Sequence, residues 1–251
     1  MADRLYKAQT RFLFHAHIKI KISAFYDDEL FDELFSVLEA VDLRYNSYKE
    51  GSFIDSINKN AGAFVDVDNE TVDILNQVIF LSDFFEGKYD ITIMPLIRLW
   101  GFYRTDERRL PSLVEIEETK KYINYKKIDI DNNRVRIQKG QEIITGSFLK
   151  AYAVDRLVEK MKDLGITDAI VNAGGSTIRA LNDEGHPDWQ VLVRNNDSGD
   201  IIHNLDIANQ CYSTSSQSNT FVDIGGRRYG HILDPVTGFP SDNKQVGIIS
   251  D

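Results

Sequence analysis

The order in which helical and alternating patterns follow one another is the strongest constraint on the fold of this chain. Ile18, Ile20 and Ile22 alternate with lysines and predict a half-buried strand within residues 12–26. Apolar residues at helical spacing predict helices at about 27–41, 69–85 and 150–163. A hairpin is expected at 126–137, and the remaining predicted strands are 169–172, 189–194, 201–207, 210–214, 228–232 and 246–250. Because strands and helices do not alternate regularly, we predict an α+β fold with mixed, largely antiparallel sheets and packed helices.

The charge balance limits the kinds of partner. The chain has 251 residues, with 29 Lys and Arg against 39 Asp and Glu, so its formal net charge is −10. That length suits one large domain or two closely packed lobes. Net acidity argues against a nucleic-acid partner, because neutralising phosphates requires a basic surface. A small anionic ligand is still compatible, since it needs only a local cluster of donors.

Cysteine content and hydropathy point to a cytoplasmic protein. Cys211 is the single cysteine, which excludes an internal disulfide and a multi-cysteine metal site. The first residues lack the apolar stretch of a signal peptide, and no apolar run approaches the roughly 20 residues of a membrane span. We therefore expect no transmembrane segment and a cytoplasmic location.

Four segments are too polar and too glycine-rich for ordinary connections: 44–58, 87–102, 172–176 and 213–238. The first reads, taken alone, as a solvated loop that follows a helix. In the second, Asp90 and Thr92 stand among apolar residues, so both side chains need hydrogen-bond partners if they are buried.

The last two segments carry groups suited to phosphate and proton chemistry. A strand that leads into Asn172-Ala173-Gly174-Gly175 offers backbone N–H groups to a phosphate or a planar ring. Pro235 and Gly238 indicate a rigid turn that presents His231 and Asp234, which suits proton transfer. A structural turn and a buried structural histidine are the alternatives. The glycine fingerprint of dinucleotide-binding folds and the P-loop motif are both absent.

Taken together and in this order, the four segments resemble the ApbE family, the FAD:protein FMN transferases. The similarity runs from about residue 12 to the end of the sequence. The segments that carry it are Tyr48–Asn58, Gly87–Phe102, Val171–Arg179 and Ser213–Pro240. The resemblance implies a T-fold-like, two-lobed architecture, formed by residues 1–251 as a single ApbE-like domain.

The resemblance also implies an activity. Such enzymes use magnesium to transfer FMN from FAD to the hydroxyl of a Ser/Thr flavinylation motif on a client flavoprotein. The product is a phosphoester, and AMP is released. His231 is implied as the catalytic base, a role that suits the pKa range of histidine. Two alternatives are a flavin-binding module without full catalysis and a magnesium-dependent FAD pyrophosphatase that releases FMN and AMP.

The resemblance assigns further residues to the site. Lys150 is implied to reach a phosphate, and Ile232 to pack near the flavin, while one magnesium ligand is implied at Ser147. The residues implied in binding FAD are Tyr48, Lys88, Tyr89, Asp90, Lys150, Asn172, Ala173, Gly174, Gly175, Ile232 and Asp234.

Several positions depart from the family pattern. Ile144 replaces a flavin-binding Asp, Ala151 replaces a Gly, and Ser176 replaces the Asp of the Asn-Ala-Gly-Gly-Asp motif. An N-terminal Met-Gly-Thr motif is degraded around residues 15–17. The family's remaining metal ligands belong to a helix expected after Asp251, where the sequence ends, so we expect weak binding of a hard cation.

Overall fold

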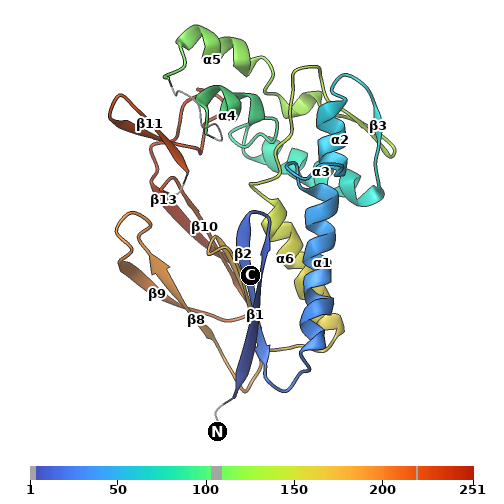
Figure 1. The fold of residues 1–251 in the computed structure, drawn as a ribbon, viewed down its shortest axis with the longest axis vertical. Coiled ribbons are helices and arrows are strands. Elements are labelled where there is room, and N and C mark those ends of the chain that lie inside the picture. The colour runs from blue at the N-terminus through green and yellow to red at the C-terminus, as the bar shows by residue number, and fades with distance from the viewer. Residues whose placement is uncertain (1–3, 103–108, 219) are drawn as a thin grey trace. The chain divides into compact units, whose positions relative to one another are not determined.

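A computed structural model describes residues 4–102, 109–218 and 220–251. The chain divides into two compact units, and each unit is assembled from segments that lie far apart in the sequence (Figure 1). Unit 1 consists of residues 1–43, 148–216 and 245–251, and unit 2 of residues 44–147 and 217–244.

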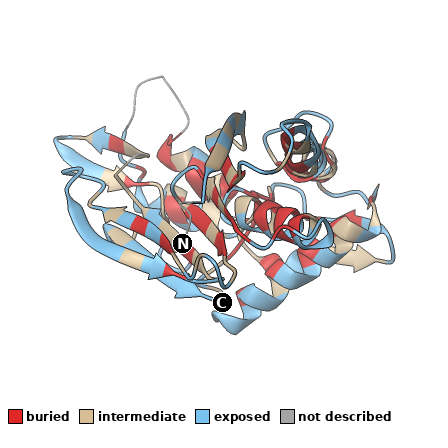
Figure 2. Cartoon of the chain, turned by 90° about the horizontal axis from the view of Figure 1, so that it is seen from below, coloured by how far each residue is buried: buried red, intermediate tan, exposed pale blue. Residues whose placement is uncertain are grey.

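Unit 1 is built on a six-stranded sheet with the strand order β1-β2-β6-β7-β10-β13. Its strands are β1 (Tyr6–Leu13), β2 (Ala16–Ser23), β6 (Ala169–Ala173), β7 (Thr177–Leu181), β10 (Cys211–Ser216) and β13 (Gln245–Ser250). Every pairing within this sheet is antiparallel, as predicted. Ile18, Ile20 and Ile22 of β2 are buried, whereas the neighbouring positions are more exposed, so the strand follows the period of two. Figure 2 shows buried, intermediate and exposed segments along the helices and strands of the chain.

Helices α1 (Glu29–Tyr45) and α6 (Leu149–Asp163) confirm two of the predicted helices. On α1, a stripe at helical spacing is buried, and Arg11 of β1 reaches the Asp32 and Glu39 carboxylates of that helix. Helix α6 packs against β6 and β7. A separate antiparallel ribbon of β8 (Trp189–Arg194) and β9 (Ile201–Ile207) contributes Trp189 and Ile207 to a core with Tyr212.

The prediction of one strand over residues 12–26 is wrong at its start. The structure has a hairpin, β1 and β2, whose turn contains Phe14 and His15 with φ of 52° and 57°. Residues other than glycine are uncommon in this left-handed region, and no hydrophobic pattern signals it. Strand β1 was therefore missed.

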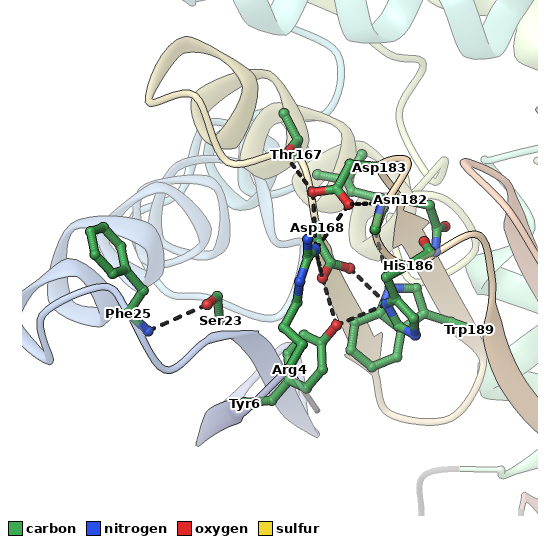
Figure 3. Close-up of polar contacts among 12 residues, drawn as sticks. Arg4, Tyr6, Ser23, Phe25, Thr167, Asp168, Asn182, Asp183, His186 and Trp189 are labelled. Carbon is green, nitrogen blue, oxygen red and sulfur yellow. Dashed lines mark hydrogen bonds and ion pairs between the residues drawn. The ribbon is translucent and has the colours of Figure 1, made fainter. Parts of the chain in front are cut away.

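A buried carboxylate ties the start of β1 to the turn between β7 and β8 (Figure 3). Asp168 is 4% exposed, and its Oδ2 accepts from Arg4 Nη1 at 2.7 Å and from the Tyr6 hydroxyl at 2.6 Å. Its Oδ1 lies 2.9 Å from Nδ1 of His186. Burial, and after it the hydrogen bond to Asp168, raises the pKa of Tyr6 to about 12.

Unit 2 combines helices with small sheets. Its elements are α2 (Phe53–Lys59), β3 (Val65–Asp66), α3 (Asn69–Phe84), α4 (Met94–Trp100), α5 (Leu113–Lys120), the 3-10 helix η1 (Tyr125–Lys127), β4 (Asp129–Asp131), β5 (Arg134–Arg136), β11 (Phe221–Ile224) and β12 (Arg227–Gly230). Helix α3 and the β4–β5 hairpin confirm the predictions. Trp100, Ile116, Ile144 and Leu233 belong to one apolar core. Helices α4 and α5 and strand β11 were not predicted.

Two sequence-based expectations for unit 2 need correction. The loop expected at 44–58 contains α2, because the Ser52 hydroxyl accepts from the Asp55 N–H and starts a helix there. The spacing of apolar residues also predicts that Phe84 lies on the buried face of α3, together with Leu75 and Val78, but the buried face of the helix is rotated away from it. Ile74 and Ser82 are buried on this face, whereas Phe84 is 68% exposed.

In the described ranges, no helix combines the length and the apolarity that crossing a membrane requires.

Candidate functional site

His231 is held in one tautomer by the backbone of unit 2. Its Nδ1 lies 3.0 Å from the carbonyl oxygen of Thr220, and its own backbone N–H donates to the same oxygen at 3.1 Å. A carbonyl only accepts, so Nδ1 carries the hydrogen and Nε2 of the neutral ring carries the lone pair. Burial lowers the pKa of His231, which favours that neutral form. Nε2 is therefore suited to accept a proton at neutral pH.

The turn after His231 is rigid, as predicted, although strand β12 ends at Gly230 rather than at Ile232. Asp234 Oδ1 accepts from the Val236 N–H at 2.7 Å, and the Asp234 carbonyl accepts from the Gly238 N–H at 2.8 Å. The Gly238 carbonyl in turn accepts from Nε1 of Trp100 at 2.9 Å. Asp234 therefore shapes the turn that follows the half-buried Ile232.

Asp90 holds the glycine-rich loop of unit 2 in place. Its side chain is buried, and Oδ1 accepts from the backbone N–H and the hydroxyl of Thr92, at 2.8 and 2.7 Å. Oδ2 accepts from the Tyr125 N–H at 3.0 Å, so the need for partners predicted from the sequence is confirmed. Burial raises the pKa of Asp90. On the same loop, Lys88 is exposed.

Two predicted site tyrosines of unit 2, Tyr89 on this loop and Tyr48, make contacts through their hydroxyl groups. The Tyr89 hydroxyl lies 3.0 Å from Oγ of the exposed Ser147, and burial raises the pKa of Tyr89. Tyr48 is 43% exposed, and its hydroxyl lies 4.0 Å from Sδ of Met94. Ile144 is buried in the core that contains Trp100.

Lys150 and the glycine turn lie together in unit 1. Lys150 Nζ donates to the Ser176 hydroxyl at 2.8 Å, and a Cβ placed on Gly174 would lie 3.9 Å from that ammonium. Burial lowers the pKa of Lys150, and in the described part of the chain no carboxylate forms an ion pair with it. A partly buried cation without a carboxylate is suited to an anionic ligand.

The sequence predicts that the backbone N–H groups of the glycine turn are free to bind a ligand. In the structure, two of them already donate hydrogen bonds within the protein. The Gly174 N–H donates to the carbonyl of His17 at 3.0 Å, and the Gly175 N–H donates to Oδ1 of Asn172 at 2.7 Å. Ala173 is buried on β6. Both glycine N–H groups are therefore occupied within unit 1, and Lys150 is the charged group beside the turn.

A magnesium site is not assembled by the described residues. Across residues 4–102, 109–218 and 220–251, no group of three or more His, Cys, Asp or Glu side chains is placed to hold a metal ion. Ser147 is exposed and offers oxygen atoms from a single residue. Magnesium prefers a near-octahedral shell of oxygens. These residues alone do not fit the ion, and no catalytic step is derived through it.

The predicted site residues are divided between the two units. Those in unit 2 are Tyr48, Lys88, Tyr89, Asp90, Ser147, His231, Ile232 and Asp234, and those in unit 1 are Lys150, Asn172, Ala173, Gly174 and Gly175. Sequence analysis missed Thr220, which fixes the His231 ring through its carbonyl. A backbone contact of this kind leaves no signal in residue type.

Comparison with known protein families places this fold. A profile of the ApbE family matches residues 14–251. The chain therefore belongs to the ApbE family, and the resemblance inferred from four short motifs is confirmed.

Individual relatives support the same placement. The chain is 25% identical over 231 residues to the FAD:protein FMN transferase of Haemophilus influenzae, covering 86% of this chain and 66% of that protein. It is 27% identical over 230 residues to the one of Escherichia coli K12, covering 88% and 65%. The chain thus spans just under two thirds of the length of these relatives.

Solved structures confirm the predicted fold class. The ApbE protein of Thermotoga maritima superposes with a TM-score of 0.89 at 27% identity, covering 98% of this chain and 82% of that one. The flavin transferase ApbE of Vibrio cholerae gives a TM-score of 0.84 at 22% identity, with coverage of 98% and 82%, which shows the fold alone.

Proposed function

We propose that this chain transfers FMN from FAD to a Ser or Thr hydroxyl of a client flavoprotein. The observation that carries the proposal is the fixed tautomer of His231 in a member of the ApbE family. The curated relatives named FAD:protein FMN transferase give the reaction its substrates.

The proposed reaction is one phosphoryl transfer. The client hydroxyl oxygen attacks the phosphorus of the FMN half of FAD and forms a new P–O bond. The P–O bond to the AMP half breaks, and AMP leaves with the electron pair. Nε2 of His231 accepts the proton of the attacking hydroxyl, which its lowered pKa allows at neutral pH.

Several of the other predicted residues bind FAD or position its binding loop in this proposal. Lys150 neutralises part of the pyrophosphate charge, because its ammonium is partly buried and has no carboxylate partner among the described residues. Tyr48, Tyr89 and Ile232 provide partly exposed apolar surface for the flavin ring. Asp90 acts as a positioning residue for their loop.

Magnesium dependence is part of the proposal and rests on the family resemblance. Magnesium, if bound, would supply neutralisation of the pyrophosphate charge, and Ser147 is the residue proposed to contribute one ligand, which other groups would have to complete. Titrating EDTA and then Mg²⁺ into the transfer assay tests this dependence.

The decisive experiment incubates the protein with FAD, Mg²⁺ and a client protein that carries a Ser/Thr flavinylation motif. We expect the client to gain the mass of FMN less one water, with one AMP released per client modified. Free FMN and AMP with unmodified client would instead identify a pyrophosphatase. FAD that is bound but unchanged would identify a flavin-binding module.

A further inference from the structure

A short stretch of unit 2 has a positive net charge, although the chain as a whole is acidic. Seven of the twenty residues from 120 to 139 are Lys or Arg and two are Asp, whereas the chain as a whole carries −10. This stretch contains η1 and the β4–β5 hairpin. None of its residues belongs to the proposed transferase site.

Most of these cations are paired with carboxylates. Lys120 and Lys121 pair with acidic residues three positions earlier on α5, at 2.9 and 2.6 Å. Arg136 pairs with Asp129 at 2.5 Å, and Lys126 lies 3.6 Å from Asp83. Arg134 pairs with Asp131.

Two other lysines of the stretch, Lys127 and Lys139, line the same pocket. Lys127 and Lys139 are exposed and form no ion pair with any carboxylate in the described ranges. The pocket has a volume of about 690 Å³, and Lys126, Arg136 and Asp129 also line it. Its lining therefore carries four cations and one carboxylate. The remaining lining residues, which include Ile128 and the fully buried Ile137, carry no charge.

The charge and size of the pocket specify a class of ligand. A volume between about 300 and 1,000 Å³ is typical of small-molecule sites. An excess of lysine ammonium groups favours a compact anion that carries several charges, since lysine acts as a point charge toward phosphate. Lys127 and Lys139 have no ion-pair partner among the described residues, so their charges also create a local positive potential at this pocket of an acidic chain.

We propose that this pocket binds a small phosphate-bearing anion through Lys127 and Lys139. The proposal stands on the pocket and its charge, and FMN transfer plays no part in it. Its failure would therefore leave the proposed function intact.

Site-resolved protection provides the test, with inorganic pyrophosphate as the probe. The unmodified protein is acetylated in limiting acetic anhydride at low ionic strength, with and without pyrophosphate, and each lysine is quantified by peptide mass spectrometry. We expect Lys127 and Lys139 to be acetylated at least fivefold more slowly with pyrophosphate. Lys120 and Lys121 should change less than twofold. Equal protection of all four lysines, or none at Lys127 and Lys139, would overturn the proposal.

Calorimetry on two matched double variants gives an independent measurement. Lys127→Ala/Lys139→Ala and Lys120→Ala/Lys121→Ala remove the same charge from neighbouring surfaces. We expect the first to weaken pyrophosphate binding at least tenfold and the second less than twofold. Equal weakening in both variants would show general charge attraction and contradict the proposal. Tighter binding of a hexaglutamate peptide than of pyrophosphate would do the same, because it would point to an acidic protein segment.

Discussion

The Nδ1 atom of His231 lies 3.0 Å from the carbonyl oxygen of Thr220. This contact decides which ring nitrogen carries the hydrogen and leaves Nε2 as the basic atom. It also orients the ring, which packs edge-on against Phe102 with a centroid distance of 6.4 Å. The proposal that His231 accepts a proton rests on this pair of residues.

Removing the base should abolish transfer while sparing FAD binding. We expect His231→Ala and His231→Gln each to lower the rate of client flavinylation by about 10²–10⁴-fold. Gln can still donate to the Thr220 carbonyl but offers no basic nitrogen, so it separates ring placement from proton transfer. Client mass spectrometry gives the rate, and flavin fluorescence titration should show FAD affinity within twofold of wild type. Unchanged turnover in either variant would remove His231 from the mechanism.

The rate of transfer should rise with pH, and the pKa of His231 should set the midpoint of this rise. The base works only when neutral, and burial lowers its pKa, so the midpoint of the rise should lie below the ordinary value of about 6.5. The measurement is kcat/KM for client flavinylation from pH 4.5 to 8. A midpoint at or above 6.5 would contradict the buried, neutral histidine.

Lys150 should contribute to FAD affinity through charge. We expect Lys150→Met to raise the Kd for FAD by about tenfold, because one cation facing the pyrophosphate is lost while most of the apolar stem is kept. Lys162→Met, at the exposed end of the same helix, is the matched control and should leave the Kd within twofold. Equal effects of the two substitutions on fluorescence titrations would argue against a phosphate contact.

The raised pKa of Tyr6, which burial and then the hydrogen bond to Asp168 cause, predicts how stability changes in alkaline solution. The pKa of Tyr6 is about 12 in the folded chain and about 10 when unfolded, so the unfolded state loses its proton first. The free energy of unfolding should therefore fall as the pH rises from about 10 to 12. Urea denaturation across this range measures it.

A substitution checks that this slope belongs to Tyr6. Asp168→Asn should bring the pKa of Tyr6 closer to 10, as followed by NMR of ¹³C-labelled tyrosine, and should flatten the alkaline slope. Asp163→Asn, at an exposed position of the same unit, should change neither quantity. A Tyr6 pKa that is the same in both variants would show that burial alone sets it.

Gly238 should tolerate a methyl group far less well than Gly51. Both have positive φ, +77° and +82°, so alanine at either position is strained by about 1–2 kcal/mol. A Cβ on Gly238 would lie 2.4 Å from Cγ2 of Ile116, whereas one on Gly51 meets nothing within 4 Å. We expect Gly238→Ala to be less stable than Gly51→Ala by about 1–3 kcal/mol in urea denaturation. Equal losses would mean that the turn shifts freely.

The sequence by itself determined the fold class, the long helices and the family. Apolar residues at a period of 3.6 specified α1, α3 and α6, because burial of one face dominates the stability of such helices. Alternation of apolar and polar residues specified β2 for the same reason. Four motifs in order identified the ApbE family from residue types alone.

Only the tertiary structure decided the contacts that give the site its properties. The Thr220 carbonyl that fixes His231, the His17 carbonyl that occupies the Gly174 N–H, and the packing of Ile144 in an apolar core all join residues distant in sequence. Short-range patterns carry information about which face is buried. Hydrogen bonds to backbone atoms and the pKa shifts caused by burial depend on the three-dimensional surroundings, and no residue type encodes these.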